Sequence, residues 1–253
     1  MSVKKRLVFI TDCLDLAYSE LRGTVLSQLH KLGSDINLEI EPVVPVKPFS
    51  IINGSFVLRL MADAYPEETI FSVILNPLRE RPARLIGKTK TKKFYFLGAN
   101  TGVFDWFLND FGIDELYEIH DPGFFPFGGK YVHAPAATQI ASGGLLSLIG
   151  SKFDSSGLVK LDIPNGTILH IDNFGLMKFR GVLPQFSEGD KLTVEISGNP
   201  FSAVYAKRMM SRETGEWVVY PGSSLGLPEI GKVRQNGAEE IGAKVGDVVK
   251  IVL

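Results

Sequence analysis

Residues 69–84 read TIFSVILNPLRERPAR, and this stretch decides the fold. Its first seven residues are apolar, aromatic or β-branched except for Ser72, a pattern typical of a strand buried on both faces of a parallel sheet. Asn76 and Pro77 end the strand, because proline has no N–H for a sheet ladder and Asn before Pro favours a turn. Three arginines then follow: Arg79, Arg81 and Arg84.

A buried strand that ends in a charged loop is a candidate binding site. Ligands of open α/β sheets bind beyond the carboxyl ends of the strands, which is where these arginines are expected to lie. The same residues also fit a solvated surface loop whose arginines take no part in binding. The stretch alone leaves both interpretations open.

Predicted strands alternate with predicted helices as far as about residue 150. Apolar runs predict strands over residues 7–11, 36–44, 69–75, 93–97 and 116–119. Apolar residues at helical spacing predict helices over residues 18–32, 52–64, 103–111 and 134–148. This alternation is typical of an α/β domain whose parallel sheet is covered by helices.

The pattern changes after residue 150. Residues 151–157 are polar and contain glycine, and we interpret them as a linker. Short β-runs separated by turn signals follow over residues 167–171, 192–196, 203–205, 217–220 and 248–252. Their spacing predicts a small antiparallel barrel or sandwich. We therefore expect two domains, residues 1–150 and residues 163–253.

The composition excludes several classes of protein. The 253 residues are 45% hydrophobic and 22% charged, which is enough apolar material for a core. The formal net charge is −1, and the lysines and arginines are too dispersed for a nucleic-acid or membrane-surface footprint. Cys13 is the only cysteine, which excludes intrachain disulfides and a cysteine zinc site. No apolar run approaches the roughly 18 residues of a membrane span, so we expect a cytoplasmic protein.

Familiar catalytic motifs are absent, but one strand tip carries an acid. The chain lacks the glycine-rich phosphate loops, the zinc-protease helix motif and the serine nucleophile elbow. Its four histidines are far apart, and we interpret them as surface or satisfied core residues rather than metal ligands. Asp12 ends the first predicted strand, where a carboxylate can accept bonds from two ribose hydroxyls. Helix capping or loop hydrogen bonding explains Asp12 equally well.

Several segments, in order along the chain, carry a family resemblance. They are residues 7–23 (LVFITDCLDLAYSELRG), 65–77 (YPEETIFSVILNP), 97–102 (LGANTG), 127–137 (FGGKYVHAPAA), 168–175 (ILHIDNFG) and 223–252. Together they resemble the S-adenosylmethionine (SAM) hydroxide adenosyltransferase family, the SAM hydrolases, which includes the SAM-dependent fluorinases and chlorinases. Each match is short, and their collinear order is what makes the resemblance specific.

The resemblance implies both an architecture and a reaction. It implies an N-terminal parallel α/β domain, a C-terminal antiparallel β-barrel and a homotrimer, with SAM between one subunit's N-terminal domain and the next subunit's C-terminal domain. Substitution at ribose C5′ expels methionine, so that water as nucleophile gives adenosine. The resemblance implies no cofactor other than SAM itself, as substrate or ligand. By the resemblance, the residues that would hold SAM are Asp12 on the ribose, Phe49 against the sugar, Phe174 and Tyr205 beside adenine, Ser223 at the methionine carboxylate, and Asn236 through backbone groups.

The chain departs from the family where the nucleophile is held. The family's water-facing Asp corresponds to Asn76, which cannot ionise, and its His corresponds to Gly128. An adenine-contacting Asn corresponds to Leu176. Two hypotheses follow. One is a slow SAM hydrolase in which Asn76 positions the water and Arg84 or Arg81 orients it. The other is a catalytically degenerate or repurposed nucleoside- or SAM-binding protein, whose different chemistry would draw on Lys130, Tyr131 and His133.

Overall fold

The computed structural model describes residues 4–33, 36–76, 82–120, 123 and 126–252. The chain divides into two compact units, Met1–Leu161 (unit 1) and Asp162–Leu253 (unit 2). No helix among the described residues is long and apolar enough to cross a bilayer.

Unit 1 is built on one eight-stranded sheet in the order β2-β1-β4-β6-β5-β7-β8, with β3 also paired to β1. The strands are β1 (Lys5–Thr11), β2 (Leu38–Ile40), β3 (Val44–Pro45), β4 (Ile70–Ile74), β5 (Arg84–Lys88), β6 (Tyr95–Ala99), β7 (Glu115–Ile119) and β8 (Gly150–Lys152). β1 pairs in parallel with β2, β3 and β4, and β4 pairs in parallel with β6. The remaining pairs, β5 with β6, β5 with β7 and β7 with β8, are antiparallel.

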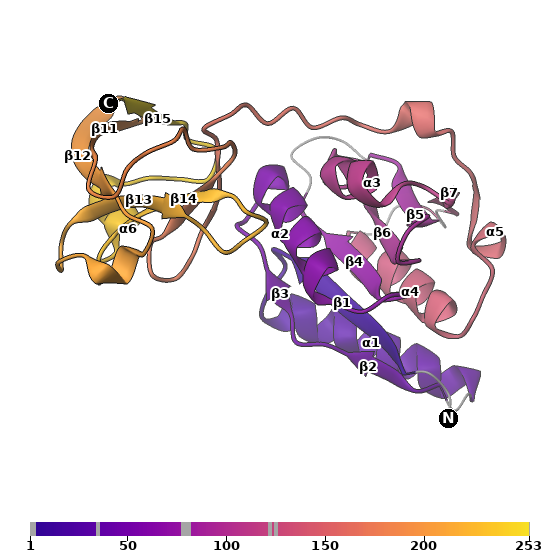
Figure 1. The fold of residues 1–253 in the computed structure, drawn as a ribbon. Helices are drawn as coiled ribbons and strands as arrows, with labels where there is room; N and C mark the ends of the chain where they lie inside the picture. Colours follow the sequence, from indigo (N-terminus) through magenta and orange to yellow (C-terminus); the bar gives the residue numbers. More distant parts are fainter. Residues whose placement is uncertain (1–3, 34–35, 77–81, 121–122, 124–125, 253) are drawn as a thin grey trace. The chain divides into compact units, whose positions relative to one another are not determined.

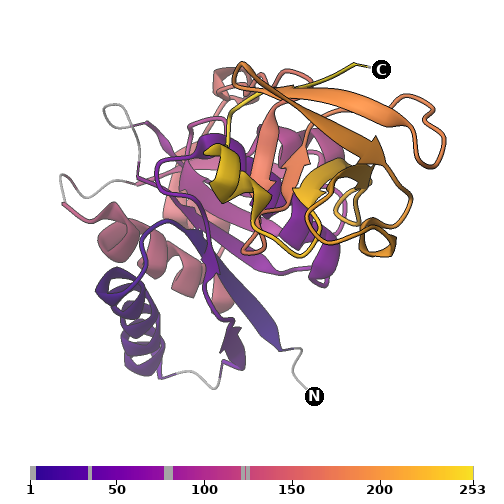
Figure 2. The ribbon, with the colours of Figure 1, turned by 90° about the vertical axis from the view of Figure 1, so that its left-hand side faces the viewer.

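Helices cover both faces of this sheet (Figure 1). They are α1 (Leu16–Leu32), α2 (Ile51–Ala64), α3 (Asp105–Phe111), α4 (Ala134–Ala141) and α5 (Leu146–Ile149), with a π-helical turn, η1 (Gly129–His133), before α4 and a 3₁₀ turn, η2 (Ser155–Gly157), after β8. α1 and α4 pack together on one face and lie side by side in both ribbon views (Figure 2). α2 and α3 pack against each other on the opposite face.

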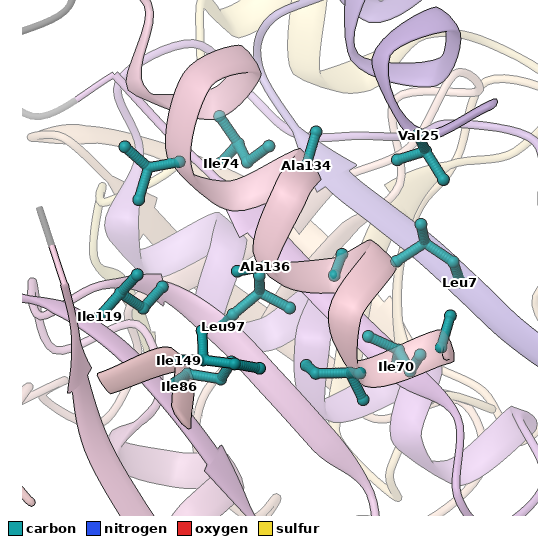
Figure 3. Packing of buried hydrophobic residues seen from close by; sticks show 14 of the residues in the cluster. Leu7, Val25, Ile70, Ile74, Ile86, Leu97, Ile119, Ala134, Ala136 and Ile149 are labelled. Carbon is teal, nitrogen blue, oxygen red and sulfur yellow. The ribbon is translucent and has the colours of Figure 1, made fainter. Parts of the chain in front are cut away.

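The face under α1 and α4 holds one core cluster (Figure 3). Leu7, Ile70 and Leu97 project from the parallel strands and are fully buried. They meet Val25 from α1 and small side chains such as Ala136 from α4, which let that helix approach the sheet closely. On the other face, phenylalanines from the strands and from α3 pack edge to face. Because both faces of β4 are covered, a one-residue slip would exchange the side chains that pack on its two faces and disrupt both cores.

Local sequence signals set the helix ends as expected. Gly33 follows α1 with φ 60°, the left-handed conformation that ends many helices and that glycine adopts without a Cβ penalty. The Ser50 Oγ accepts a hydrogen bond of 3.2 Å from the Asn53 N–H and so caps the N-terminus of α2.

The structure differs from the predicted elements of unit 1 at four places. The single strand over residues 36–44 is two short strands, β2 and β3, in a proline-rich segment. The helix over residues 134–148 stops at α4, because Gly143 has φ 83°, and resumes as α5. Strand β5 was not predicted, and β8 occupies part of the expected linker. The sheet is therefore mixed, parallel in its first half and antiparallel at the β5–β7–β8 side.

Unit 2 is a curled seven-stranded half-barrel sheet in the order β15-β11-β12-β13-β14-β10-β9. Its strands are β9 (Ile168–Ile171), β10 (Met177–Phe179), β11 (Lys191–Ile196), β12 (Asn199–Tyr205), β13 (Trp217–Pro221), β14 (Pro228–Lys232) and β15 (Val249–Val252); its helices are η3 (Met209–Ser211) and α6 (Gly237–Ile241). All pairs are antiparallel except β12 with β13. Next to the edge strands, Thr167 and Val248 form a single bridge. The predicted fold class, an α/β domain followed by a curled antiparallel sheet, is confirmed, although β10 and β14 were not predicted.

Candidate functional site

The carboxyl ends of β1 and β4 lie next to each other and carry two of the predicted site residues. The parallel register pairs Leu7 with Ile70 and Thr11 with Ile74, so both strands end at the same edge of the sheet. Asp12 directly follows β1, and its Oδ1 accepts a hydrogen bond of 3.0 Å from the backbone N–H of Asn76. The Asn76 side-chain amide also lies 3.4 Å from the same oxygen. The structure therefore brings Asp12 and Asn76 into direct contact.

Asp12 also holds the loop that carries Phe49. The backbone N–H of Phe49 donates to Asp12 Oδ2 at 2.9 Å. Phe49 has φ 59°, an uncommon conformation for a residue with a Cβ, and its side chain is 52% exposed. Strained backbone of this kind persists only where the surroundings over-determine it, and the bond to Asp12 supplies part of that restraint. One carboxylate thus joins three loops, which agrees with the loop-bonding interpretation of Asp12.

Cys13 was not predicted as part of this junction, although it directly follows Asp12. Its Sγ lies 3.6 Å from Asp12 Oδ1 and 3.8 Å from the Asn76 Nδ2. Burial is the main cause that raises the pKa of the Cys13 thiol, and the neighbouring Asp12 adds to it. The thiol is therefore a protonated, weakly reactive group at neutral pH. The signal for it was adjacency to Asp12 in the sequence.

Arg84 is the first residue of β5, opposite Ala99 on β6. Its guanidinium lies against the backbone of Gly128, where an added Cβ would come within 2.7 Å of the Arg84 Nη2. The space that a side chain at position 128 would occupy is thus taken by the guanidinium of Arg84. Pro77, Arg79 and Arg81 lie outside the described residues.

His133 lies at the end of η1 and is only 5% exposed. Neither of its ring nitrogens has a hydrogen-bond partner among the described residues. Burial, and secondarily the charge of Arg84, lowers the pKa of His133 to about 4. The prediction of a satisfied core histidine is therefore wrong for His133. The sequence could not show this, because both burial and pairing depend on contacts distant in the chain.

Lys130 and Tyr131, which the second hypothesis grouped with His133, face solvent instead. Lys130 forms an ion pair of 2.6 Å with Glu20 of α1, and its Nζ lies 5.3 Å from the centre of the Tyr131 ring. Tyr131 is exposed, whereas His133 is buried. Within the described residues, no group of three or more His, Cys, Asp or Glu is arranged to hold a metal ion.

The other predicted residues belong to unit 2, and two of their loops meet. Phe174 is 67% exposed on a turn whose next residue, Gly175, packs against the side chain of Asn236. Asn236 caps α6, accepting a bond of 3.1 Å from the Glu239 N–H at its Oδ1. The structure thus brings the Phe174 turn and Asn236 together.

Tyr205 ends β12, and its ring centre lies 5.6 Å from that of Phe186. Tyr205 and Phe186 line an open groove of about 620 Å³, to which Pro221 and Pro228 also contribute. Ser223 lies in the connection between β13 and β14, one residue after Gly222. Two aromatic rings beside an open groove form a surface on which a planar ring can stack.

The comparisons with known proteins agree with this architecture. Residues 7–150 match the model of the SAM hydroxide adenosyltransferase N-terminal domain. The (R)-S-adenosyl-L-methionine hydrolase of Methanocaldococcus jannaschii is 27% identical over 161 residues, which are 61% of this chain and 58% of that protein. The alignment thus spans less than two thirds of the relative.

Two solved structures share the fold over nearly the whole chain. The crystal structure of an uncharacterized conserved protein from Thermotoga maritima covers 97% of this chain and all of its own, with a TM-score of 0.81 and 23% identity. That of a conserved hypothetical protein from Thermus thermophilus covers 98% of this chain and all of its own, with a TM-score of 0.75 and 20% identity. At these identities the likeness concerns the fold alone. Because the family model spans more than half of the residues, the chain belongs to the SAM hydroxide adenosyltransferase family.

Proposed function

We propose that this protein binds SAM and directs water to ribose C5′, giving adenosine and methionine. The observation that carries the proposal is the junction of Asp12, Phe49 and Asn76 beyond the carboxyl ends of β1 and β4, in a chain of the SAM hydroxide adenosyltransferase family. The relative from M. jannaschii bears the name of the same activity.

The reaction requires few catalytic contributions from the protein. The oxygen of water forms a bond to C5′ while the C5′–S bond breaks, and the electron pair of that bond passes to sulfur, which becomes the neutral thioether of methionine. The attacking water loses its proton to solvent. Since the sulfonium is already a good leaving group, the protein must mainly hold a partly desolvated water in line with the C–S bond.

Separate residues would bind the ribose and hold the attacking water. A carboxylate offers about four acceptor positions, so Asp12 can hold both loop N–H groups and still accept a ribose hydroxyl. Asn76 would position the water, and Arg84 would orient it. An amide cannot take the proton of water, and a general base is typically worth about 10²–10⁴ in rate, so turnover is expected to be slow.

Residues of unit 2 would complete the site across a trimer interface. Phe174 and Tyr205 would flank adenine, Ser223 would meet the methionine carboxylate, and Asn236 would contribute backbone groups. The contact of the Phe174 turn with Asn236, and the aromatic groove beside Tyr205, support this assignment. The trimer itself can be measured by sedimentation.

A SAM- or nucleoside-binding protein without turnover is the second candidate. The amide of Asn76 favours it, because that side chain lies between Asp12 and Cys13 and adds no ionisable group to the strand tips. Stacking and backbone contacts would then hold the nucleoside without any group that activates water.

A product assay with calorimetry separates the two candidates. Purified protein is incubated with SAM, and adenosine and methionine are quantified against a blank. N76D serves as the gain-of-function variant, because a carboxylate there lies beside Asp12, whose charge raises its pKa toward that of a useful base. We expect N76D to raise the rate by about 10²-fold or more, whereas N109D, on the exposed side of α3, leaves it unchanged.

Products above blank establish the hydrolase. Binding heat with SAM, but no products even in N76D, establishes the binding protein. No heat with either SAM or adenosine refutes both candidates.

A further inference from the structure

Four neighbouring strands of unit 2 carry a row of polar side chains on one face of the sheet. The register pairs His170 of β9 with Lys178 of β10, Lys178 with Glu229 of β14, and Glu229 with Tyr220 of β13. Residues that face each other directly across strands point to the same side of a sheet. Their immediate neighbours Met177 and Ile230 point to the other side, into the core of unit 2.

The middle of the row is a buried charge network. Lys178 and Glu229 are only 8% and 4% exposed. The Nζ of Lys178 lies 3.5 Å from Glu229 Oε1 and 3.4 Å from Asp172 Oδ2. The Tyr220 hydroxyl donates to the other Glu229 oxygen at 2.7 Å, and burial raises the pKa of Tyr220, so it remains a donor. Lys178 therefore contacts one buried carboxylate, Glu229, and one partly exposed carboxylate, Asp172, and removing the cation would leave the buried carboxylate without its charge partner.

One end of this network holds the turn that carries Phe174. Asp172 Oδ1 accepts hydrogen bonds of 3.0 Å from the backbone N–H groups of both Phe174 and Leu176. Its second oxygen is the one that Lys178 contacts. The orientation of the Asp172 carboxylate, and with it the shape of the turn, therefore depends on Lys178.

The other end of the network lies under the loop that carries Ser223. The Glu229 carboxylate packs so closely on Gly222 that a Cβ at that position would overlap it. The loop closes on itself through the Gly222 N–H, which donates to the Leu227 carbonyl at 2.9 Å. A displaced Glu229 carboxylate would therefore move Gly222 and the Ser223 that follows it.

We propose that Lys178 is a positioning residue for ligand binding: through Asp172 and Glu229 it holds the Phe174 turn and the Ser223 loop in the one arrangement that accepts an adenosyl ligand. The choice of ligand rests on the proposed function. Without the cation, the buried Glu229 carboxylate is uncompensated and Asp172 loses the contact that orients its second oxygen, so Glu229 must move or take up a proton while Asp172 is free to turn toward solvent, which weakens the cap on the Phe174 turn.

The test uses K178M, with two readouts on the full chain. Hydrogen exchange at the amides of Phe174 and Leu176 reports the turn without any ligand, and we expect exchange about 10-fold faster or more, with β11 amides unchanged. Calorimetry should show SAM and adenosine affinities lower by about 10- to 100-fold, the range for one charged hydrogen bond. K178R should restore most of the slow exchange at these amides and most of the affinity for SAM and adenosine. K250M is the matched control, because Lys250 forms an exposed pair of 3.0 Å with Glu195 in the same unit.

The outcomes separate this inference from the proposed function. If the wild type binds neither SAM nor adenosine, the proposed function fails, while amide exchange still decides the role of Lys178. Equal exchange at Phe174 and Leu176 in wild type and K178M overturns the positioning role, whatever the affinities. If K178M unfolds the whole unit, Y220F decides instead: it keeps every charge and removes only the bond to Glu229. Faster exchange at the Leu227 and Gly222 amides then supports the network, and unchanged exchange refutes it.

Discussion

The buried His133 gives unit 1 a calculable sensitivity to acid. In the folded chain its pKa is about 4, because burial and the charge of Arg84 both disfavour the imidazolium. In the unfolded chain the ordinary value is about 6.5. Above pH 6.5 the ring is neutral in both states, so it contributes no pH dependence there.

The sign follows from which state binds the proton. Between pH 6.5 and 4 the unfolded chain takes up a proton that folded His133 does not, so stability falls as the pH falls. The loss is about 1.4 kcal/mol per pH unit and reaches about 3 kcal/mol near pH 4. At pH 4.5 it amounts to about 2.5 kcal/mol, a large part of a typical domain's stability.

Urea unfolding measures this loss. The chain has two tryptophans, Trp106 in unit 1 and Trp217 in unit 2, so fluorescence in a W217F background reports unit 1. We expect H133L to lose about 2.5 kcal/mol less than the parent between pH 7 and 4.5. H133L should also be at least as stable at pH 7, because it removes two polar atoms without a partner among the described residues.

Carboxylates also make the free energy of unfolding depend on pH. Their contribution is the same in the parent and in H133L, so it cancels in the difference between the two. H120Q is the control, because His120 is exposed and its ring contacts only the Ser151 hydroxyl, at 3.1 Å, among the interactions that the structure describes. The reasoning is refuted if the parent and H133L lose the same stability over this pH range.

Three further predictions concern the strand-tip junction and the Phe174 turn. D12N replaces one of the two accepting oxygens with an NH₂ group, so whichever way the amide turns it faces a loop N–H with a donor, and unit 1 should lose about 1–3 kcal/mol in urea unfolding; an unchanged midpoint would show that Asp12 does not hold the loops. G175A should destabilise unit 2 by about 1–3 kcal/mol more than G189A, since both glycines have positive φ but only Gly175 lacks room for a Cβ, against Asn236; equal unfolding midpoints would contradict this. Alkylation of Cys13 should have its pH midpoint above that of a free thiol, because burial raises its pKa, and a midpoint at or below the free value would rule this out.

The sequence was most informative where local pattern and burial coincide. Strand β4 is buried along its whole length, so its run of apolar residues predicted both the strand and the place where it ends. Gly33 predicted the end of α1 for a similarly local reason, its tolerance of positive φ. By contrast, β5 has only five residues, including Gly87, and follows a charged segment, so no periodicity revealed it.

The sequence alone could not predict contacts between residues that are far apart along the chain. Lys178 and Glu229 are charged residues in two short strands that lie far apart in the sequence, and only the register of β10 with β14 places them together. That the His133 ring nitrogens lack hydrogen-bond partners among the described residues likewise depends on how η1 packs on the sheet. The roles assigned to Asn76, Arg84, Phe49 and the residues of unit 2 stay predictions until binding and turnover are measured.

The Arg84 guanidinium occupies the volume that a side chain at position 128 would need, so the residues at these two positions are not independent. The backbone of Gly128 has φ −58°, which any amino acid can adopt, so conformation does not demand glycine there. What demands it is the guanidinium of Arg84, which lies 2.7 Å from where a Cβ would be. A side chain can therefore be gained at position 128 only if the one at position 84 shrinks or turns away. A histidine at position 128 therefore requires the Arg84 guanidinium to turn away or a smaller side chain to replace it.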